Sequence, residues 1–202
     1  MIHRIALFAT FSLIVWSLVA CKPEQAPSQK ADFGPSPPRK PAEPEGPFYE
    51  LTTDDISSHP NWTSRNITLF GAKLGDLTRN AEKNFGPAIT TRNIAQDYLT
   101  VYQNNAVFVF TFKSTGKMRK FQVYQTFAGK IADPKLKKLL TAGDLKTMRD
   151  TLGMEERVEE SAEDPEAPAT EYIYDSRGLR FIKYKVKGQT LNSLLFGEVR
   201  PR

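Results

Sequence analysis

Two stretches of the chain repeat the same succession of hydrophobic and polar positions. The first contains Leu74-Gly75-Asp76-Leu77 and then Phe85-Gly86, and the second contains Ala142-Gly143-Asp144-Leu145 and then Leu152-Gly153. Each stretch has an aspartate suited to cap the start of a helix and a glycine suited to the position just past its end. The apolar residues between them recur at spacings of three and four, so each stretch predicts a short amphipathic helix.

Downstream of each predicted helix, the pattern changes to the alternation that is typical of strands. Residues 102–113 match residues 174–185 in register, and Gly116 matches Gly188. Residues with turn propensity separate the apolar runs, which indicates antiparallel hairpins. The expected fold class is therefore α+β, with two tandem units that each contain one helix followed by three antiparallel strands.

Two further elements are predicted outside these units. Asp133 is a good N-terminal cap and Pro134 suits the first helical position, so a helix should begin there and continue through about Leu140. A short strand is expected from Ile67 to Phe70, ahead of the first unit.

Alternation along the strands also assigns the faces of the sheet. We expect one row of side chains to point at the helices: Phe108, Phe110, Phe112, Arg180, Ile182, Tyr184 and Val186. The opposite face then mixes apolar and basic residues, which favours a binding surface for a partner. The candidate partner-binding residues are Tyr98, Tyr102, Tyr172, Tyr174, Phe181, Lys183 and Lys185. Protection of sheet edges by lysine, which needs no ligand, explains the same lysines equally well.

The first twenty residues have the pattern of a secretory signal. A basic start at Arg4 precedes an almost wholly apolar run from Ile5 to Val19. The run is too short for a membrane-spanning helix, and small residues close it, which favours a cleaved signal over a transmembrane segment. Residues 1–20 are therefore interpreted as a signal peptide.

The signal segment ends in Leu18-Val19-Ala20-Cys21, which resembles a bacterial lipobox. The resemblance implies cleavage before Cys21, a diacylglyceryl thioether on its sulfur and acylation of the freed amine. Stable anchoring needs more than one acyl chain, and this modification supplies two or three. We therefore expect a lipid-anchored protein of the bacterial cell envelope. Lys22 stands where lipoproteins of the inner membrane often carry Asp, which favours the outer membrane, facing the periplasm.

A proline-rich linker is expected between this anchor and the folded units. Eight of the 14 prolines lie between residues 22 and 48. Such a segment cannot bury enough apolar surface to offset its ordering entropy, and proline favours extended backbone. The predicted organisation is a signal peptide at 1–20, the lipidated cysteine and linker at 21–48, a first repeat at 49–130 and a second repeat at 131–202.

The two repeats also resemble a known family. The run from Ile67 to Asp76, followed by Phe85-Gly86-Pro87 and a tyrosine-bearing strand, is similar to SmpA/BamE-type outer-membrane lipoproteins. It is also similar to the tandem fold of β-lactamase inhibitory proteins. The resemblance covers about residues 66–126 and a duplicate at about 134–199. It implies a small helical pair against an antiparallel sheet that binds proteins through its sheet face and loops.

Composition and charge narrow the function classes. The chain has 202 residues, of which 40% are hydrophobic and 25% charged, an ordinary globular composition. Its formal net charge is +5, but export argues against a nucleic-acid partner. The single cysteine excludes an intrachain disulfide, and His59 is the only histidine beyond the signal segment, so no site with two histidine ligands can form there. No hydrolase, phosphate-binding or dinucleotide-binding motif is present.

A short stretch of the second repeat is rich in carboxylates. Seven carboxylates lie between Glu155 and Glu166. Their spacing matches no calcium-binding loop, and Pro165 and Pro168 favour a solvated insertion over a metal site or an acid–base pair.

The sequence thus predicts a non-enzymatic, membrane-anchored envelope lipoprotein that acts as a protein-interaction module in outer-membrane assembly or maintenance. The competing interpretation is an inhibitor, or a module that binds lipid headgroups or glycans through a basic, aromatic sheet face. No cofactor or metal is expected. The expected partners are the membrane, through the lipid on Cys21, and an envelope protein.

The anchor provides the first testable prediction. Replacing the acceptor sulfur in Cys21→Ser should leave a precursor that no longer incorporates labelled palmitate, because the thioether cannot form. Metabolic labelling followed by gel electrophoresis measures this. Normal acylation and processing of the variant would contradict the lipoprotein interpretation.

Overall fold

The computed structural model describes residues 46–162 and 164–197. The predicted signal peptide, Cys21 and most of the proline-rich linker lie outside these residues. Within the described ranges, no helix is both long enough and apolar enough to cross a membrane.

The described residues form three α-helices, each with an apolar face. They are α1 (Thr78–Phe85), α2 (Pro134–Ala142) and α3 (Leu145–Leu152). Asp133 caps α2 by accepting hydrogen bonds from the amides of Lys135 and Leu136, and Asp144 caps α3 through the amide of Thr147. The predicted starts of α2 and α3 are thereby confirmed.

The start of α1 differs from the prediction. Leu77, not Asp76, occupies its N-cap position, and no side chain caps the helix there. The carboxylate of Asp76 instead accepts a hydrogen bond from the amide of Lys73, 2.9 Å away, and so closes the turn before the helix. The carboxylate of Asp76 thus hydrogen-bonds within the preceding turn instead of capping α1.

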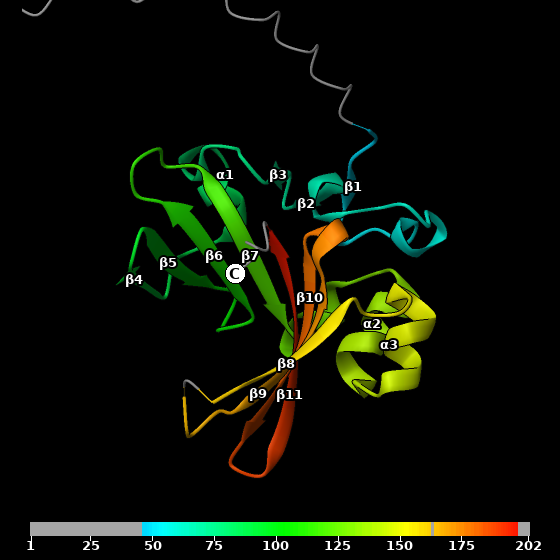
Figure 1. Cartoon of the computed structure of the whole chain (residues 1–202). Coiled ribbons are helices and arrows are strands. Elements are labelled where there is room, and N and C mark those ends of the chain that lie inside the picture. The colour runs from blue at the N-terminus through cyan, green and yellow to red at the C-terminus, as the bar shows by residue number, and fades with distance from the viewer. Residues whose placement is uncertain (1–45, 163, 198–202) are drawn as a thin grey trace, which may run out of the picture. The chain divides into compact units, whose positions relative to one another are not determined.

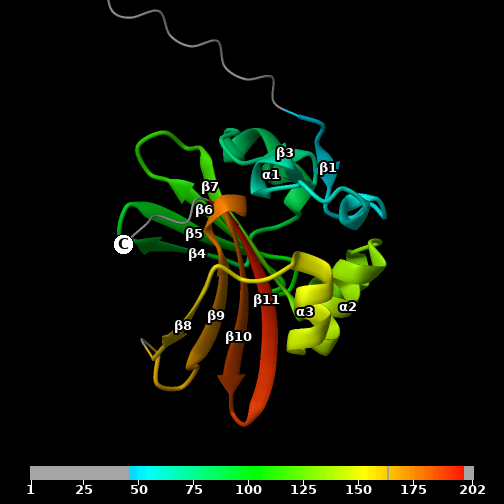
Figure 2. The same ribbon diagram turned by 45° about the vertical axis from the view of Figure 1, so that its right-hand side comes forward.

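One large antiparallel sheet dominates the fold (Figures 1 and 2). Its strands are β4 (Thr90–Ile94), β5 (Asp97–Tyr102), β6 (Val107–Phe112), β7 (Met118–Tyr124), β8 (Arg157–Ser161), β9 (Ala169–Tyr174), β10 (Leu179–Val186) and β11 (Gln189–Gly197). They pair in the order β4-β5-β6-β7-β11-β10-β9-β8.

The prediction of two helix-plus-three-strand units is therefore wrong. Each half of the sheet holds four consecutive strands, and the pairing of β7 with β11 joins the halves into one eight-stranded sheet. The strands missing from the prediction are the two edges, β4 and β8. Strand β8 occupies part of the acidic stretch that was predicted to be a solvated insertion.

A second, three-stranded sheet forms the N-terminal part of the described chain. It consists of β1 (Tyr49–Glu50), β2 (Ile67–Leu69) and β3 (Ala72–Lys73). The carboxylate of Glu50 accepts hydrogen bonds from the amides of Phe70 and Gly71, each 2.8 Å long. These bonds hold the turn between β2 and β3, where Phe70 adopts a positive φ of 52°. Short 3₁₀ segments complete the chain at η1 (Ile56–Ser58), η2 (Ser64–Asn66), η3 (Gln125–Lys130) and η4 (Asp175–Arg177).

Two polar contacts fasten the N-terminal part to the large sheet and its helices. The second oxygen of Asp133 accepts a hydrogen bond from the amide of Ser57 at 2.7 Å. The guanidinium of Arg177 donates to the carbonyls of Trp62 at 3.1 Å and Leu152 at 2.7 Å. Both groups therefore link segments that are far apart in sequence.

The helices cover the face of the sheet opposite to the one predicted. Val107, Val109 and Phe181 are fully buried in one core with Phe85 of α1 and Leu139 of α2. The phenylalanines that alternate with the valines on β6 are only partly buried. Both rows of β6 are apolar, so alternation alone could not assign the faces.

The joint between β7 and β11 is closed by two buried aromatic rings. Phe121 and Phe196 are register partners, and their rings stack with centroids 4.6 Å apart. Neither side chain is exposed. Next to this pair, Gly197 has φ 146°, and a Cβ there would lie 2.7 Å from the carbonyl oxygen of Arg119. Only glycine permits this close approach of the two strands.

The joint leads to a stability prediction. Phe196→Ala removes a fully buried ring and should lower the free energy of unfolding by about 3–5 kcal/mol. Chemical denaturation of the purified protein measures this. The matched control is Phe48→Ala, because Phe48 is 40% exposed, and its loss should cost about 1 kcal/mol or less. Equal losses in the two variants would contradict the assigned core.

Candidate functional site

The sheet face turned away from the helices is the candidate site, and we call it the open face. Its central side chains are Phe108, Phe110, Phe112, Arg119, Lys120, Tyr124, Arg180 and Tyr184, placed there by cross-strand register and ring contacts. Each of them is partly buried. The main core cluster, to which the helices contribute, includes none of them. The open face therefore presents aromatic and cationic groups that the described helices do not cover.

A β-bulge places two cations side by side on this face. Phe110 pairs with Lys120 but the next residue, Thr111, pairs with Met118, so Arg119 is the extra residue on β7. A bulge puts two consecutive side chains on one face and re-aims them. The guanidinium carbon of Arg119 lies 4.8 Å from the ring centroid of Phe112, and the ammonium of Lys120 lies 5.7 Å from that of Phe110. Each cation thus rests over its own phenylalanine ring.

Arg119 is held in place by a buried ion pair. Its Nη1 lies 3.0 Å from the nearer carboxylate oxygen of Asp97, and the two side chains are only 8% and 9% exposed. Among the described residues, the Nε atom of Arg119 is buried without a hydrogen-bond partner, as is that of Arg180. An unsatisfied buried donor costs roughly 1–3 kcal/mol, so each of these two Nε atoms lowers the stability of the fold.

A row of aromatic rings crosses the centre of the open face. The ring of Phe108 lies 4.8 Å from that of Tyr124, and Tyr124 lies 6.0 Å from Tyr184. Burial raises the pKa of Tyr124 well above its usual value, and the neighbouring Tyr184 raises it further. The side chain of Gln122 donates to the hydroxyls of Tyr184 at 3.0 Å and Ser193 at 2.7 Å. These bonds fix the tyrosine against the strand joint.

The second half of the open face repeats the pairing of a guanidinium with a carboxylate. Arg180 on β10 bonds to Glu171 on β9 at 2.5 Å, and both side chains are 19% exposed. Beside this pair, Ile173 and Ile182 are buried although they lie outside the main core cluster. The aromatic row is thus flanked by ion-paired arginines on both halves of the sheet.

Three of the predicted binding residues are buried, and a fourth lies on the helix-side face of the sheet. Phe181 is fully buried in the core, and Tyr102 and Tyr174 are 1% and 2% exposed, so none of these three is available to a partner. Burial, followed by the carboxylate of Glu82, raises the pKa of Tyr102 to about 12. Tyr98 remains 42% exposed, but it lies near the β4 edge on the helix-side face.

The other three predicted residues also lie off the open face. Tyr172 is partly buried and packs against Phe181 with ring centroids 6.1 Å apart. Lys183 is partly exposed and Lys185 fully exposed, and register puts both on the helix-side face toward the β10–β11 turn. The sequence-based prediction exchanges the two faces of β6 and β10. It therefore places Phe108, Phe110 and Tyr184 in the core, whereas the structure places them on the open face.

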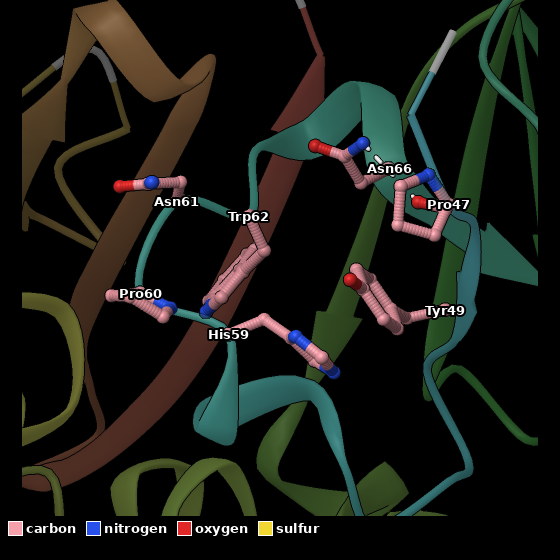
Figure 3. A pocket seen from close by; sticks show the side chains of 7 residues that line it. All are labelled: Pro47, Tyr49, His59, Pro60, Asn61, Trp62 and Asn66. Carbon is pink, nitrogen blue, oxygen red and sulfur yellow. Dashed lines mark hydrogen bonds between the residues drawn. The ribbon is translucent and has the colours of Figure 1, made fainter.

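A shallow pocket of about 220 Å³ lies in the N-terminal part of the described chain (Figure 3). It is lined by Pro47, Tyr49, His59, Pro60, Asn61, Trp62 and Asn66. The rings of Tyr49 and His59 stack with centroids 4.4 Å apart. No carboxylate or second imidazole lines this pocket to activate His59. Its chemistry suits a small neutral group, and Trp62, which is 3% exposed, contributes more to the core than to the lining.

The described residues contain no group of three or more histidine, cysteine, aspartate or glutamate side chains arranged to hold a metal ion. This finding includes the carboxylates of β8 and β9. The open face has charged groups, but they are ion-paired across strands rather than convergent on one point.

Comparisons with known proteins add little to this geometry. No family model and no curated protein matches the chain. Among solved structures, a DUF4309 family protein, YjgB from Bacillus subtilis, is similar over 59% of this chain and 77% of its own, with 13% identity and a TM-score of 0.36. A likeness at this level carries no argument about fold or function. The resemblance to SmpA/BamE-type lipoproteins stays a prediction.

The buried pair on the open face generates a third prediction. Arg119→Ala and Asp97→Ala should each lower the free energy of unfolding by about 3–5 kcal/mol, because each leaves a buried charge without its partner. The double variant should lose less than the sum of the two, with a coupling of about 0.5–3 kcal/mol. Denaturant unfolding of all four proteins measures the cycle.

The exposed pair Lys146–Asp150 provides the control, with side chains that are 85% and 62% exposed. Alanine at these positions should change stability little, because water screens the pair. Additive effects of Arg119→Ala and Asp97→Ala would show that the two groups do not depend on each other.

Proposed function

We propose that this protein is a non-enzymatic, lipid-anchored module of the bacterial cell envelope that binds an envelope protein through the open face. The observation that carries the proposal is the composition of that face, where aromatic rings and arginines lie uncovered by the described helices. Tyrosine, phenylalanine and arginine are the residues that protein interfaces enrich, and they dominate binding energy.

The preorganisation of the open face supports the same proposal. Arg119 is fixed by Asp97 and by the ring of Phe112, and Arg180 is fixed by Glu171. A side chain that is already ordered loses little entropy when a partner binds. The face also spans both halves of the sheet, so its extent matches a protein surface better than a small ligand.

The charge of the open face indicates the chemistry of the partner. By register and contacts, its cations are Arg92, Arg119, Lys120, Arg157 and Arg180. Its carboxylates are Asp97, Glu159 and Glu171, together with Asp175, which pairs with Arg157 from η4. Cations are in excess, so a complementary partner presents a negative patch around an apolar centre. Such complementarity speeds association and selects the partner, and it weakens as salt rises.

Site-specific photo-crosslinking in intact envelopes tests the proposed function. A photoreactive amino acid at Phe110 should form an adduct with one protein species, identified by mass spectrometry. Lys120→Glu in the same chain should lower the adduct yield several-fold, because it reverses the charge beside the crosslinker. The matched control places the same amino acid at Thr115, which is exposed in the turn between β6 and β7.

The outcomes separate the alternatives. Equal adducts from Phe110 and Thr115, or none from Phe110, would overturn the assignment of the open face as the docking surface. An adduct with lipid or glycan instead of protein would favour the competing interpretation of a headgroup- or glycan-binding module.

A further inference from the structure

The helical pair α2–α3 carries a group of exposed lysines that is not part of the open face. On the outer side of α2, Lys135, Lys137 and Lys138 are all exposed, while the intervening leucines are buried. The first turn of α3 adds Lys146, whose side chain is 85% exposed. A nine-residue helix is about 13 Å long, so the three lysines of α2 form a compact basic surface.

One carboxylate on α3 neutralises part of this surface, because Asp150 pairs with Lys146 at 2.6 Å. The two aspartates that precede the helices form other bonds. Asp133 is fully buried and accepts hydrogen bonds from three backbone amides. Asp144 caps α3. Among the described residues, no hydrogen bond or ion pair engages the ammonium groups of Lys135, Lys137 or Lys138. Their charge is therefore directed outward.

An apolar side chain accompanies the lysines. Leu145, the first residue of α3, is 42% exposed, although leucine on a short helix is usually buried. Lysine stems are themselves apolar and reach outward with the charge at the tip. Exposed lysines and an exposed leucine on one helical pair are typical of a surface that rests in the headgroup region of a bilayer.

The opposite side of the molecule has the opposite charge. The β8–β9 hairpin carries Glu159, Glu160, Asp164, Glu166 and Glu171. In both views the tip of this hairpin and the pair α2–α3 lie on opposite sides of the large sheet (Figures 1 and 2). A negatively charged surface would attract one side of the molecule and repel the other, so it would orient the whole domain.

We infer that the α2–α3 surface docks on an anionic lipid bilayer, with the lysines at the headgroups and Leu145 at the interface. A protein partner fits this surface less well, because lysine is depleted from protein interfaces and the exposed helix faces carry neither tryptophan nor tyrosine. The one arginine on α3, Arg149, is paired with Glu155 at 2.6 Å. The inference rests on the proposed lipid anchor only for bringing the domain close to a membrane.

The expected effect follows from general membrane electrostatics. Each basic side chain beside an anionic bilayer strengthens attachment about fivefold, so the three lysines of α2 together give about a hundredfold. The effect decays over a Debye length, which falls from about 10 Å at 0.1 M salt to about 3 Å at 1 M. Attachment of this surface should therefore be lost at high salt, whereas a lipid anchor is retained.

Lysine footprinting on the full chain tests the inference. The purified protein is mixed with vesicles of phosphatidylcholine, or of phosphatidylcholine and phosphatidylglycerol in equal parts, and acetylation of each lysine is followed by mass spectrometry. On anionic vesicles at low salt, the rates at Lys135, Lys137 and Lys138 should fall about tenfold or more. Zwitterionic vesicles or 1 M salt should restore the rates.

Two variants with the same change of charge complete the test. Lys135→Glu, Lys137→Glu and Lys138→Glu together should abolish the protection of Lys146. The control changes Lys117, Lys185 and Lys187 to Glu, all exposed in or next to the hairpin turns of the large sheet, and should leave Lys146 protected.

These measurements separate failure of the lipid-docking surface from failure of the lipid anchor. Equal acetylation of the α2 lysines on both kinds of vesicle, or loss of Lys146 protection in both variants, would overturn the lipid-docking surface. Failure of the chain to float with phosphatidylcholine vesicles would refute the anchor instead, and protection on anionic vesicles would still decide the role of α2.

Discussion

The pairing of β7 with β11 is the constraint on which the rest of the architecture depends. It turns two four-stranded halves into a single eight-stranded sheet. The stacked rings of Phe121 and Phe196 fill the joint, and Gly197 lets the strands approach where a Cβ would collide with the backbone of β7. The helices can then cover one continuous face, and the other face becomes a single surface rather than two.

This arrangement separates two surfaces of different chemistry. The open face has aromatic rings and ion-paired arginines such as Arg119 and Arg180. The planar guanidinium groups suit a partner whose polar groups are arranged in a matching geometry. The helical pair has exposed lysines and the exposed Leu145, whose long side chains suit a surface without fixed geometry. Because the two surfaces lie on opposite faces of the sheet, the domain has the means to contact a bilayer on one side and a protein on the other.

The sequence predicts the helices better than the sheet. Asp133, Pro134 and Asp144 act through local hydrogen bonds, so α2 and α3 begin where the sequence indicates. The edge strands β4 and β8 are mostly polar and exposed, and they exist because a neighbour pairs with them, which no local pattern reveals. The two apolar rows of β6 left the faces undecided, since Val107 and Phe108 are equally plausible core residues. The open face was therefore not predictable until cross-strand partners were known.

The bulge on β7 gives the open face an arrangement that stability alone does not favour. A regular strand would send Arg119 and Lys120 to opposite faces, and an apolar pair in place of Arg119 and Asp97 would avoid the desolvation of two charges. The fold instead disrupts a ladder, buries an ion pair and leaves the Nε of Arg119 without a partner. Each of these features costs stability in the isolated protein. On the proposed function, a negatively charged partner that binds this face would offset part of these costs through charge complementarity.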